Sequence, residues 1–307
     1  MSFITSLPSW GLIRAAGADA QTFLHGQLTN DLLHLAPDGA QWSAYCTAKG
    51  RMLAGFLVWR DGADGFYLAV DRALLPALVK RLSMFVLRAK VVMEDVSPAF
   101  SLFGVSGGAA HMPAPGGAMQ VQRQAEHDGG LWRITLPAVD GEARELVCVP
   151  AADTAYAAST ALPLADAAAW TRLMVRAGEV WITAPTQEQF VPQMVNFDAL
   201  GGINFKKGCY PGQEIVARAH FRGAVKRRMY RATVAAPAQA GDLLYASDLN
   251  GQESGRVALA APDGQGGSEL LAVLQIQSHA AAEVRLGSVD GPLLQFASLP
   301  YALPDPL

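Results

Sequence analysis

The carboxy-terminal part of the chain constrains the fold most, because its pattern of short apolar runs permits few arrangements. Beyond Arg228 the sequence is a series of short apolar or alternating runs separated by glycine-rich turns, at residues 229–235, 242–246, 255–260, 269–276, 282–286 and 293–297. Short strands at regular spacing with turn residues between them are typical of barrels. The sequence therefore predicts a small β-barrel at this end.

The amino-terminal part alternates helices with strands. Its apolar spacing predicts helices at residues 19–35 and 71–88, and strands at residues 52–59, 65–70, 90–94 and 100–105. The turn-rich linker Arg60–Asp64 fits a hairpin between the first two strands. Adjacent strands with short turns favour antiparallel pairing, so we expect an α+β fold rather than a doubly wound parallel sheet.

The middle of the chain repeats this pattern after an interruption. Residues 107–130 are rich in Gly, Ala and Pro, which predicts a surface connection rather than a core element. Strands are expected at residues 131–136 and 145–149, and helices at residues 151–161 and 165–177.

Composition limits the class of protein. With 307 residues, of which 51% are hydrophobic and 17% charged, the chain can bury the cores of two or three domains. The cysteines form no Cys-x-x-Cys pair, which fits neither a disulfide framework nor a sequence-local zinc site: Cys46, Cys148 and Cys209. We expect no metal site and a reducing compartment. Without a targeting segment or an apolar run of about 18 residues, the sequence predicts a cytoplasmic protein.

The segment Lys206–Glu214, with the sequence KKGCYPGQE, combines a thiol, two ammonium groups, two glycines and a carboxylate. Pro211 suits a first helical position, so Cys209 is expected just ahead of a short helix. Unpaired amides at the helix start, together with Lys206 and Lys207, would favour a thiolate there. The alternative is a buried structural cysteine, as in most intracellular chains.

Other residues of this segment are candidates for supporting roles. Gly208 and Gly212 allow a tight turn or a close approach of a ligand to the backbone. Tyr210 belongs to the same loop, and Gln213 and Glu214 are placed to orient the loop or a ligand.

The stretch from Phe190 to Arg228, with its Lys-Gly-Cys-Tyr-x-Gly-Gln-Glu core, closely resembles the YgfZ family of folate-binding proteins. These are relatives of the glycine-cleavage aminomethyltransferase that support iron-sulfur proteins. Two further segments match that family, Phe23–Asp31 (FLHGQLTND) and Cys46–Met52 (CTAKGRM). With Trp10–Ile13 also matching, the resemblance is close to full length.

The resemblance implies a fold and a division into domains. We expect a two-part, aminomethyltransferase-like folate-binding body followed by the barrel. Its first part would comprise residues 1–50 and 131–225, with residues 51–130 inserted as the second part and residues 226–307 forming the barrel.

The resemblance also implies a ligand, tetrahydrofolate or a derivative. Trp10 and Trp170 match aromatic residues of the family's folate pocket, and aromatic rings stack well on a flat pterin. Without the resemblance, both would be read as core residues. Arg51 and Lys49 could meet the anionic glutamyl tail, with a solvated loop as the alternative.

Two departures from the related proteins bear on chemistry. The aminomethyltransferase needs an acidic residue in the strand where this chain has Met52–Phe56 (MLAGF), so its transfer chemistry is not expected here. Related chains carry Glu where this one has Arg176, which offers only donors to a pterin. Glu179 is a possible replacement.

These observations predict a tetrahydrofolate-binding accessory protein for the assembly or repair of iron-sulfur clusters, working through Cys209. Its partners would be folate and iron-sulfur client or assembly proteins, and whether it is an enzyme stays open. The alternative is a folate-dependent aminomethyl transferase. Two weaker alternatives are an RNA-binding module using Lys226–Arg228 and a thiol oxidoreductase, which lacks a resolving cysteine nearby.

Overall fold

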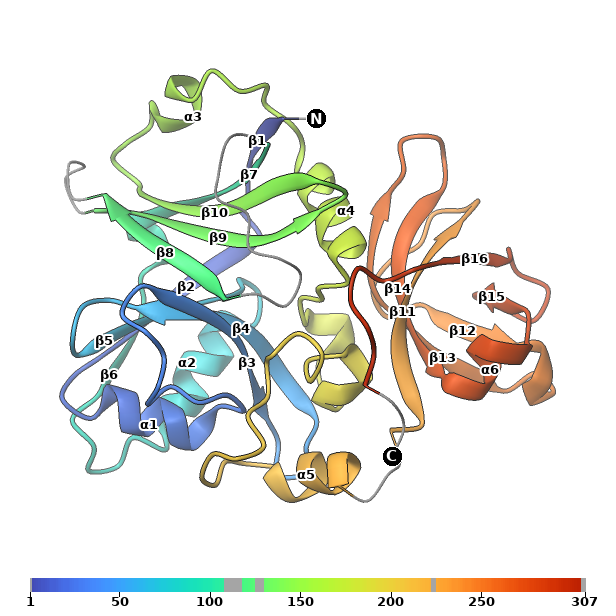
Figure 1. The fold of residues 1–307 in the computed structure, drawn as a ribbon, viewed down its shortest axis with the longest axis horizontal. Helices are drawn as coiled ribbons and strands as arrows, with labels where there is room; N and C mark the ends of the chain where they lie inside the picture. Colours follow the sequence, from blue (N-terminus) through green and yellow to red (C-terminus); the bar gives the residue numbers. More distant parts are fainter. Residues whose placement is uncertain (1, 108–117, 125–129, 222–224, 305–307) are drawn as a thin grey trace.

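The computed structural model describes residues 2–107, 118–124, 130–221 and 225–304. Two sheets dominate it, one of ten strands and one of six. Figure 1 shows the large sheet with most of the helices on one side of the molecule and the small sheet on the other, with helix α4 (Ala167–Ala177) between them. The predicted α+β class, with antiparallel sheets and packed helices followed by a carboxy-terminal barrel, is confirmed.

The large sheet has the spatial order β1-β7-β10-β9-β8-β3-β4-β5-β2-β6. Its strands are β1 (Phe3–Ser6), β2 (Trp10–Ala16), β3 (Gly39–Cys46), β4 (Met52–Arg60), β5 (Gly65–Asp71), β6 (Val92–Asp95), β7 (Phe100–Ser106), β8 (Met119–Gln124), β9 (Leu131–Val139) and β10 (Glu142–Pro150). Strands β4 and β5 form the predicted hairpin, with Val58 opposite Leu68. Both are almost entirely buried, so this hairpin lies within the main core.

The first helix, α1 (Ala20–Gln27), is much shorter than the predicted helix at residues 19–35. It ends because Leu28 turns to extended backbone geometry and forms a β-bridge with Tyr45. Asp19 occupies the N-cap position, but its carboxylate accepts a hydrogen bond from the backbone N–H of Lys90 at 2.7 Å rather than from an N–H group of α1. A tertiary contact therefore overrides the local helical pattern.

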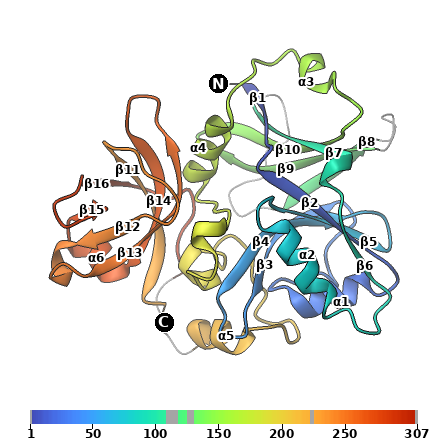
Figure 2. The ribbon, with the colours of Figure 1, turned by 180° about the vertical axis from the view of Figure 1, so that it is seen from behind.

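The other helices with a predicted span, at residues 71–88, 151–161 and 165–177, are also shorter than predicted, and two further helices are present. In chain order these helices are α2 (Leu75–Ser83), α3 (Tyr156–Ser159), α4, α5 (Gln213–Phe221) and α6 (Ile276–Ala281), with short 3-10 turns η1 (Ser97–Ala99), η2 (Ala184–Thr186), η3 (Pro192–Val195) and η4 (Ser247–Leu249). Helix α2 starts late because Asp71 continues strand β5 and Pro76 suits the first helical turn. Figure 2 shows α1 and α2 on one face of the strands β2 to β6.

The predicted surface connection at residues 107–130 contains a strand that composition concealed. Strand β8 pairs with β9 and, through Ala40 and Met119, with β3. It thereby joins the two halves of the large sheet. Residues 108–117 and 125–129 of the connection lie outside the described residues.

All six short runs beyond Arg228 are strands, as predicted. They are β11 (Arg227–Val234), β12 (Leu243–Ala246), β13 (Glu253–Pro262), β14 (Ser268–Gln275), β15 (Val284–Leu286) and β16 (Leu294–Ala297), in the spatial order β15-β12-β13-β14-β11-β16. A bridge between Arg285 and Leu293 links the two edges of this sheet, as barrel closure requires.

Helix α4 connects the large sheet to the barrel. Asp166 caps its start by accepting a hydrogen bond from the Ala169 N–H at 3.0 Å, and Gly178 ends it with φ +65°. The helix contacts β1 and β9 on one side and β13 and β14 on the other. Its Trp170 ring lies so close to Gly104 that a Cβ at that position would be 2.4 Å from the ring.

Strand pairing crosses both predicted boundaries inside the body. Strands β3 and β4 pair across residue 50, and β8 and β9 pair across residue 130. The two parts of the body thus share one sheet, and their separation at residues 50 and 130 stays a prediction.

Within the described part of the chain, no helix has the length and apolar character needed to cross a membrane.

Candidate functional site

The loop before α5 presents the thiol to solvent. Cys209 is exposed, and α5 begins at Gln213. Pro211 is therefore not the first helical residue as predicted, because Gly212 follows it with φ +81°, a left-handed conformation outside a helix. The loop places Cys209 ahead of a short helix, but a further turn separates the two.

The other two cysteines lack this access. Cys46 lies at the end of β3 and Cys148 in β10, and both are buried. Burial raises the pKa of both thiols, which disfavours the reactive thiolate. Cys209 is therefore the one cysteine of this chain placed to meet a partner molecule.

Lys207 holds the loop against the end of α1. Its side chain is buried, and its Nζ donates hydrogen bonds to the backbone carbonyls of His25 and of Leu28, the latter at 2.7 Å. Nζ also lies 4.7 Å from the ring centroid of Tyr210. Because carbonyls at a helix end attract a cation, this lysine stabilises the position of the loop rather than facing solvent.

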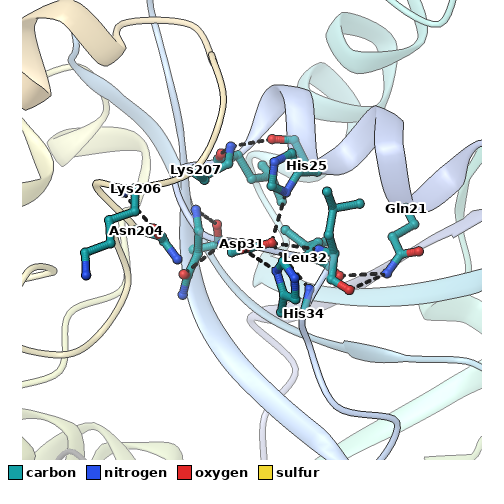
Figure 3. A network of polar contacts seen from close by, with 12 residues as sticks. Gln21, His25, Asp31, Leu32, His34, Asn204, Lys206 and Lys207 are labelled. Atoms are coloured by element: carbon teal, nitrogen blue, oxygen red, sulfur yellow. Dashed lines mark hydrogen bonds and ion pairs between the residues drawn. The ribbon is translucent and has the colours of Figure 1, made fainter.

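A cluster of ionisable groups lies beside this lysine (Figure 3). The Asp31 carboxylate is 3.2 Å from Nδ1 of His25 and 2.8 Å from Nδ1 of His34. Burial would raise the pKa of Asp31, but hydrogen bonds from His34 and from the Leu33 and His34 backbone N–H groups lower it overall. Burial, with the nearby Lys207 ammonium, lowers the pKa of His25.

Burial also lowers the pKa of Lys207 to about 8, although the Asp31 carboxylate and Cys209 oppose the shift. Between that value and the usual 10.5, the unfolded chain holds a proton that the folded chain has released. The free energy of unfolding should therefore rise with pH across this window, by at most about 1.4 kcal/mol per pH unit.

Urea unfolding from pH 7 to about pH 10, on the natural chain and on Lys207→Met, measures this contribution of Lys207. The difference between the two curves cancels the other titrating groups, and we expect it to grow in favour of the natural chain as the pH rises. Parallel curves would contradict the assignment. Burial raises the pKa of Tyr210 from its usual value of 10.0, so its opposite effect on stability begins only at the upper end of this window.

The second and third matching segments support the same loop. Thr29 donates from Oγ1 to the Gly202 carbonyl at 2.7 Å, and its own carbonyl accepts from the Asn204 N–H at 3.0 Å. On the other side, a Cβ on Gly212 would lie 2.4 Å from the Thr47 carbonyl oxygen. Through Lys207 and Gly212, the KGCYPGQE loop that carries Cys209 therefore contacts both the FLHGQLTND and the CTAKGRM segments.

Gln213 and Glu214 differ in their surroundings. Gln213 donates from Nε2 to the Lys207 carbonyl at 3.5 Å, a long contact within the loop. Glu214 points to solvent, where its only ion pair among the described residues is an exposed one with Arg218 at 2.7 Å. Gln213 can orient the loop, whereas Glu214 is free to face a partner.

Trp10 and Trp170, the residues matched to the folate pocket, are both buried and do not lie in one aromatic cluster. Trp10 stacks on Trp181 with ring centroids 4.1 Å apart, and Trp181 in turn meets Trp42 edge-on at 5.7 Å. Trp170 packs between Gly104 and the guanidinium of Arg144, 6.0 Å away.

Glu179 and Arg176 have structural partners. Glu179 is buried and forms a two-point ion pair with Arg144, at 2.7 and 2.9 Å. Arg176 points the other way and binds Glu269 of β14 in the barrel, with its closest contact at 2.5 Å. The position that carries Glu in related chains therefore joins the body to the barrel in this one.

Arg51 is partly exposed. It donates from Nη1 to the Gln189 carbonyl at 2.5 Å and lines a cavity of about 180 Å³ at the edge of the barrel, together with Arg227 and Arg256. Lys49 is exposed on the turn that packs against Gly212. Both cations are thus accessible to solvent.

The basic run 226–228 is not a uniform charged face. Arg228 is buried and pairs with Asp198 through two contacts of 2.6 and 2.9 Å. It also donates to the Gln193 carbonyl at 2.9 Å. Only Lys226 and Arg227 of this run are left to meet another molecule.

Several residues of the site went unassigned in the sequence. His25, Thr29 and Asp31 lie within the FLHGQLTND segment, so the family match itself was the available signal. Arg144 lies in a stretch that no motif distinguishes. Its role depends on Glu179, which is 35 residues away in the chain.

A scan against protein-family models found no match. Among curated proteins, the chain is 31% identical over 308 residues to the tRNA-modifying protein YgfZ of Vibrio vulnificus (strain YJ016), across 98% of this chain and 93% of that protein. It is also 31% identical over 309 residues to the tRNA-modifying protein YgfZ of Escherichia coli (strain SMS-3-5 / SECEC), with the same coverage.

Among solved structures, the glycine cleavage system aminomethyltransferase T from Bartonella henselae aligns with a TM-score of 0.71. The alignment covers 97% of this chain and 86% of that one, at 16% sequence identity. The chain therefore has the aminomethyltransferase fold, as predicted.

Proposed function

Because the chain belongs to the family of the tRNA-modifying protein YgfZ, we propose that it is a tetrahydrofolate-binding accessory protein for the assembly or repair of iron-sulfur clusters. It would act in the cytoplasm, with iron-sulfur assembly or client proteins as partners. The relatives' name concerns tRNA modification, and we assign this chain an indirect part in it, through support of iron-sulfur enzymes.

The observation that carries the proposal is the position of Cys209. It is an exposed thiol on a loop that a buried lysine and a tightly packed glycine hold in place. A thiolate can bind iron transiently, but a cluster typically needs four protein ligands. A donor or client protein would therefore supply the remaining ligands.

The tryptophans fit a folate in part. Nε1 of Trp181 is buried without a hydrogen-bond partner among the described residues, so it can donate to an acceptor on a pterin edge. Trp10 stacks on Trp181, and Trp10, Trp170 and Trp181 are all buried, so a pterin would reach these rings only where the side chains around them make room. Bound tetrahydrofolate would supply an amine that accepts one-carbon units.

Strand β4 argues against aminomethyl transfer in this chain. Ala54 and Gly55 are buried, and the Phe197 ring would lie 3.1 Å from a Cβ on Gly55. An acidic side chain is absent from this part of β4, and the space beside it holds an aromatic ring. The fold shared with aminomethyltransferase T is therefore the main argument for that alternative.

The test is a rescue experiment in cells that lack this protein. The activity of a cellular iron-sulfur enzyme is compared after expression, at equal level, of the natural chain, Cys209→Ala or Gly208→Ala. The last variant keeps the thiol and changes the same loop where an added Cβ meets no atom within 4 Å. We expect rescue by the natural chain and Gly208→Ala but not by Cys209→Ala.

The other outcomes separate the parts of the proposal. If Cys209→Ala rescued the enzyme activity as well as the natural chain does, the protein would still support iron-sulfur enzymes, but the Cys209 thiol would not be needed for that role. If cells without the protein show no iron-sulfur deficit, the accessory role is wrong and the aminomethyl transferase becomes the better reading.

A further inference from the structure

The segment that follows α2 exposes apolar side chains in an unusual concentration. Met84, Phe85, Leu87 and Val92 are 59%, 46%, 86% and 58% exposed. We call residues 84–92 the apolar loop. Single exposed apolar residues are ordinary on a protein surface, but a contiguous group of them marks an interaction site.

The backbone of this loop holds Leu87 outward. Leu87 has φ +48°, a left-handed conformation that side chains other than glycine rarely adopt. A strained backbone conformation that exposes a leucine to solvent does not stabilise the isolated protein. Such strain is often retained where a side chain must meet a partner.

The charge around the loop is mostly positive, with acidic groups at Asp19, which accepts a hydrogen bond from the Lys90 N–H at 2.7 Å, and at Glu94 and Asp95 in the second half of β6. From Arg72 to Met93 the sequence has no acidic residue, although the chain as a whole has a net charge of −3. The same stretch contains five basic residues, Arg72, Lys80, Arg81, Arg88 and Lys90. Lys80, Arg88 and Lys90 are exposed, so the apolar loop has a basic rim that favours an acidic partner.

The loop leads into an open sheet edge. Strand β6 is the last strand of the large sheet and pairs, among the described strands, only with β2 (Figure 2). One side of its backbone therefore has N–H and C=O groups available to another strand. Val92, at the start of β6, belongs to both the exposed edge and the apolar loop.

We propose that the apolar loop and the free edge of β6 bind an extended segment of a partner protein in which apolar and acidic residues alternate. The segment would add to β6 as a further strand, its apolar side chains meeting Leu87 and Val92 and its carboxylates meeting Arg88 and Lys90. A membrane surface would leave the backbone of β6 unpaired. RNA would find one aromatic side chain in the loop, Phe85, on which to stack. The site does not depend on folate or on Cys209.

The experiment selects peptides from a random twelve-residue library displayed on phage, using the full chain as bait. Selected peptides are then synthesised, and their dissociation constants are measured for the natural chain, Leu87→Ser and the double variant Arg88→Glu/Lys90→Glu. The matched control is Leu164→Ser, which changes a leucine that is 75% exposed elsewhere. Unchanged melting temperatures establish that the variants are folded.

We expect the selected peptides to alternate apolar and acidic residues. Leu87→Ser and the charge-reversed variant should each weaken binding by about tenfold or more, the equivalent of about 1.4 kcal/mol, whereas Leu164→Ser should not. Amide exchange at residues 92–95 should slow when the peptide binds.

Three results would overturn the proposal. The first is that no peptides are enriched, or that those enriched bind all the variants equally. The second is that peptides bind without slowing exchange in β6. The third is binding of anionic phosphatidylglycerol vesicles or of tRNA, lost in the same two variants, when the peptides themselves do not bind.

Discussion

Replacement of Glu179 by alanine is expected to lower the free energy of unfolding by about 3–5 kcal/mol. The variant would leave the guanidinium of Arg144, whose side chain is fully buried, without its carboxylate partner. Among the described residues, the Arg144 guanidinium would retain its hydrogen bonds to the Pro137 carbonyl, at 2.8 and 2.9 Å, and its contact with the Trp170 ring. Urea denaturation at neutral pH measures the loss.

The controls distinguish this effect from a general loss of charge. Glu283→Ala removes an acidic partner from an exposed pair with Arg285 and should cost less than about 1 kcal/mol. Replacing both members of the buried pair, as Arg144→Met with Glu179→Leu, should recover much of the stability, because no unpaired charge remains. If Glu179→Ala lowered the free energy of unfolding by less than about 1 kcal/mol, the Arg144–Glu179 pair would not contribute substantially to stability.

Gly212→Ala is expected to disrupt the thiol loop while leaving Cys209 itself unchanged. An alanine there must adopt φ +81°, and its Cβ would lie 2.4 Å from the Thr47 carbonyl oxygen and 2.7 Å from Gly50 Cα. Both of these atoms are backbone atoms, which cannot rotate away. The combined cost of the conformation and the overlap should be about 2–5 kcal/mol of unfolding free energy.

Gly208→Ala is the matched comparison, because it lies beside the same cysteine and its new Cβ would meet no atom within 4 Å. We expect its unfolding free energy to stay within about 1 kcal/mol of the natural value. In the rescue experiment, Gly212→Ala should fail and Gly208→Ala succeed at equal protein level. Equal stability of the two variants would show that the contact between Gly212 and the Thr47 turn does not hold the loop.

The strands were readable from the sequence, whereas the helix ends were not. All six barrel strands and the β4–β5 hairpin follow from alternation and turn residues, which are local signals. Helix α1 ends eight residues before its predicted end at residue 35, because Leu28 pairs with Tyr45 of β3. Such pairing depends on residues distant in the chain, and no local pattern contains it.

The candidate site was predicted in part. The segment around Cys209 was identified from its own residues, and the thiol is exposed as a reactive cysteine requires. The hydrogen-bond partners of Lys207 are His25 and Leu28, which precede it by 182 and 179 residues. A lysine expected to favour the Cys209 thiolate therefore holds two distant segments together. Its part in any chemistry stays a proposal.

By itself, the sequence determined the α+β class, the antiparallel strands, the barrel and the family, because each depends on residue types at short spacing. The tertiary structure alone decided that Glu179 pairs with Arg144, that Arg176 faces the barrel, and that the three matching segments meet at the loop that carries Cys209. Charge pairs and close backbone approaches depend on which distant residues the fold brings together. Their energies are set by burial, which appears only when the sheets and α4 have packed.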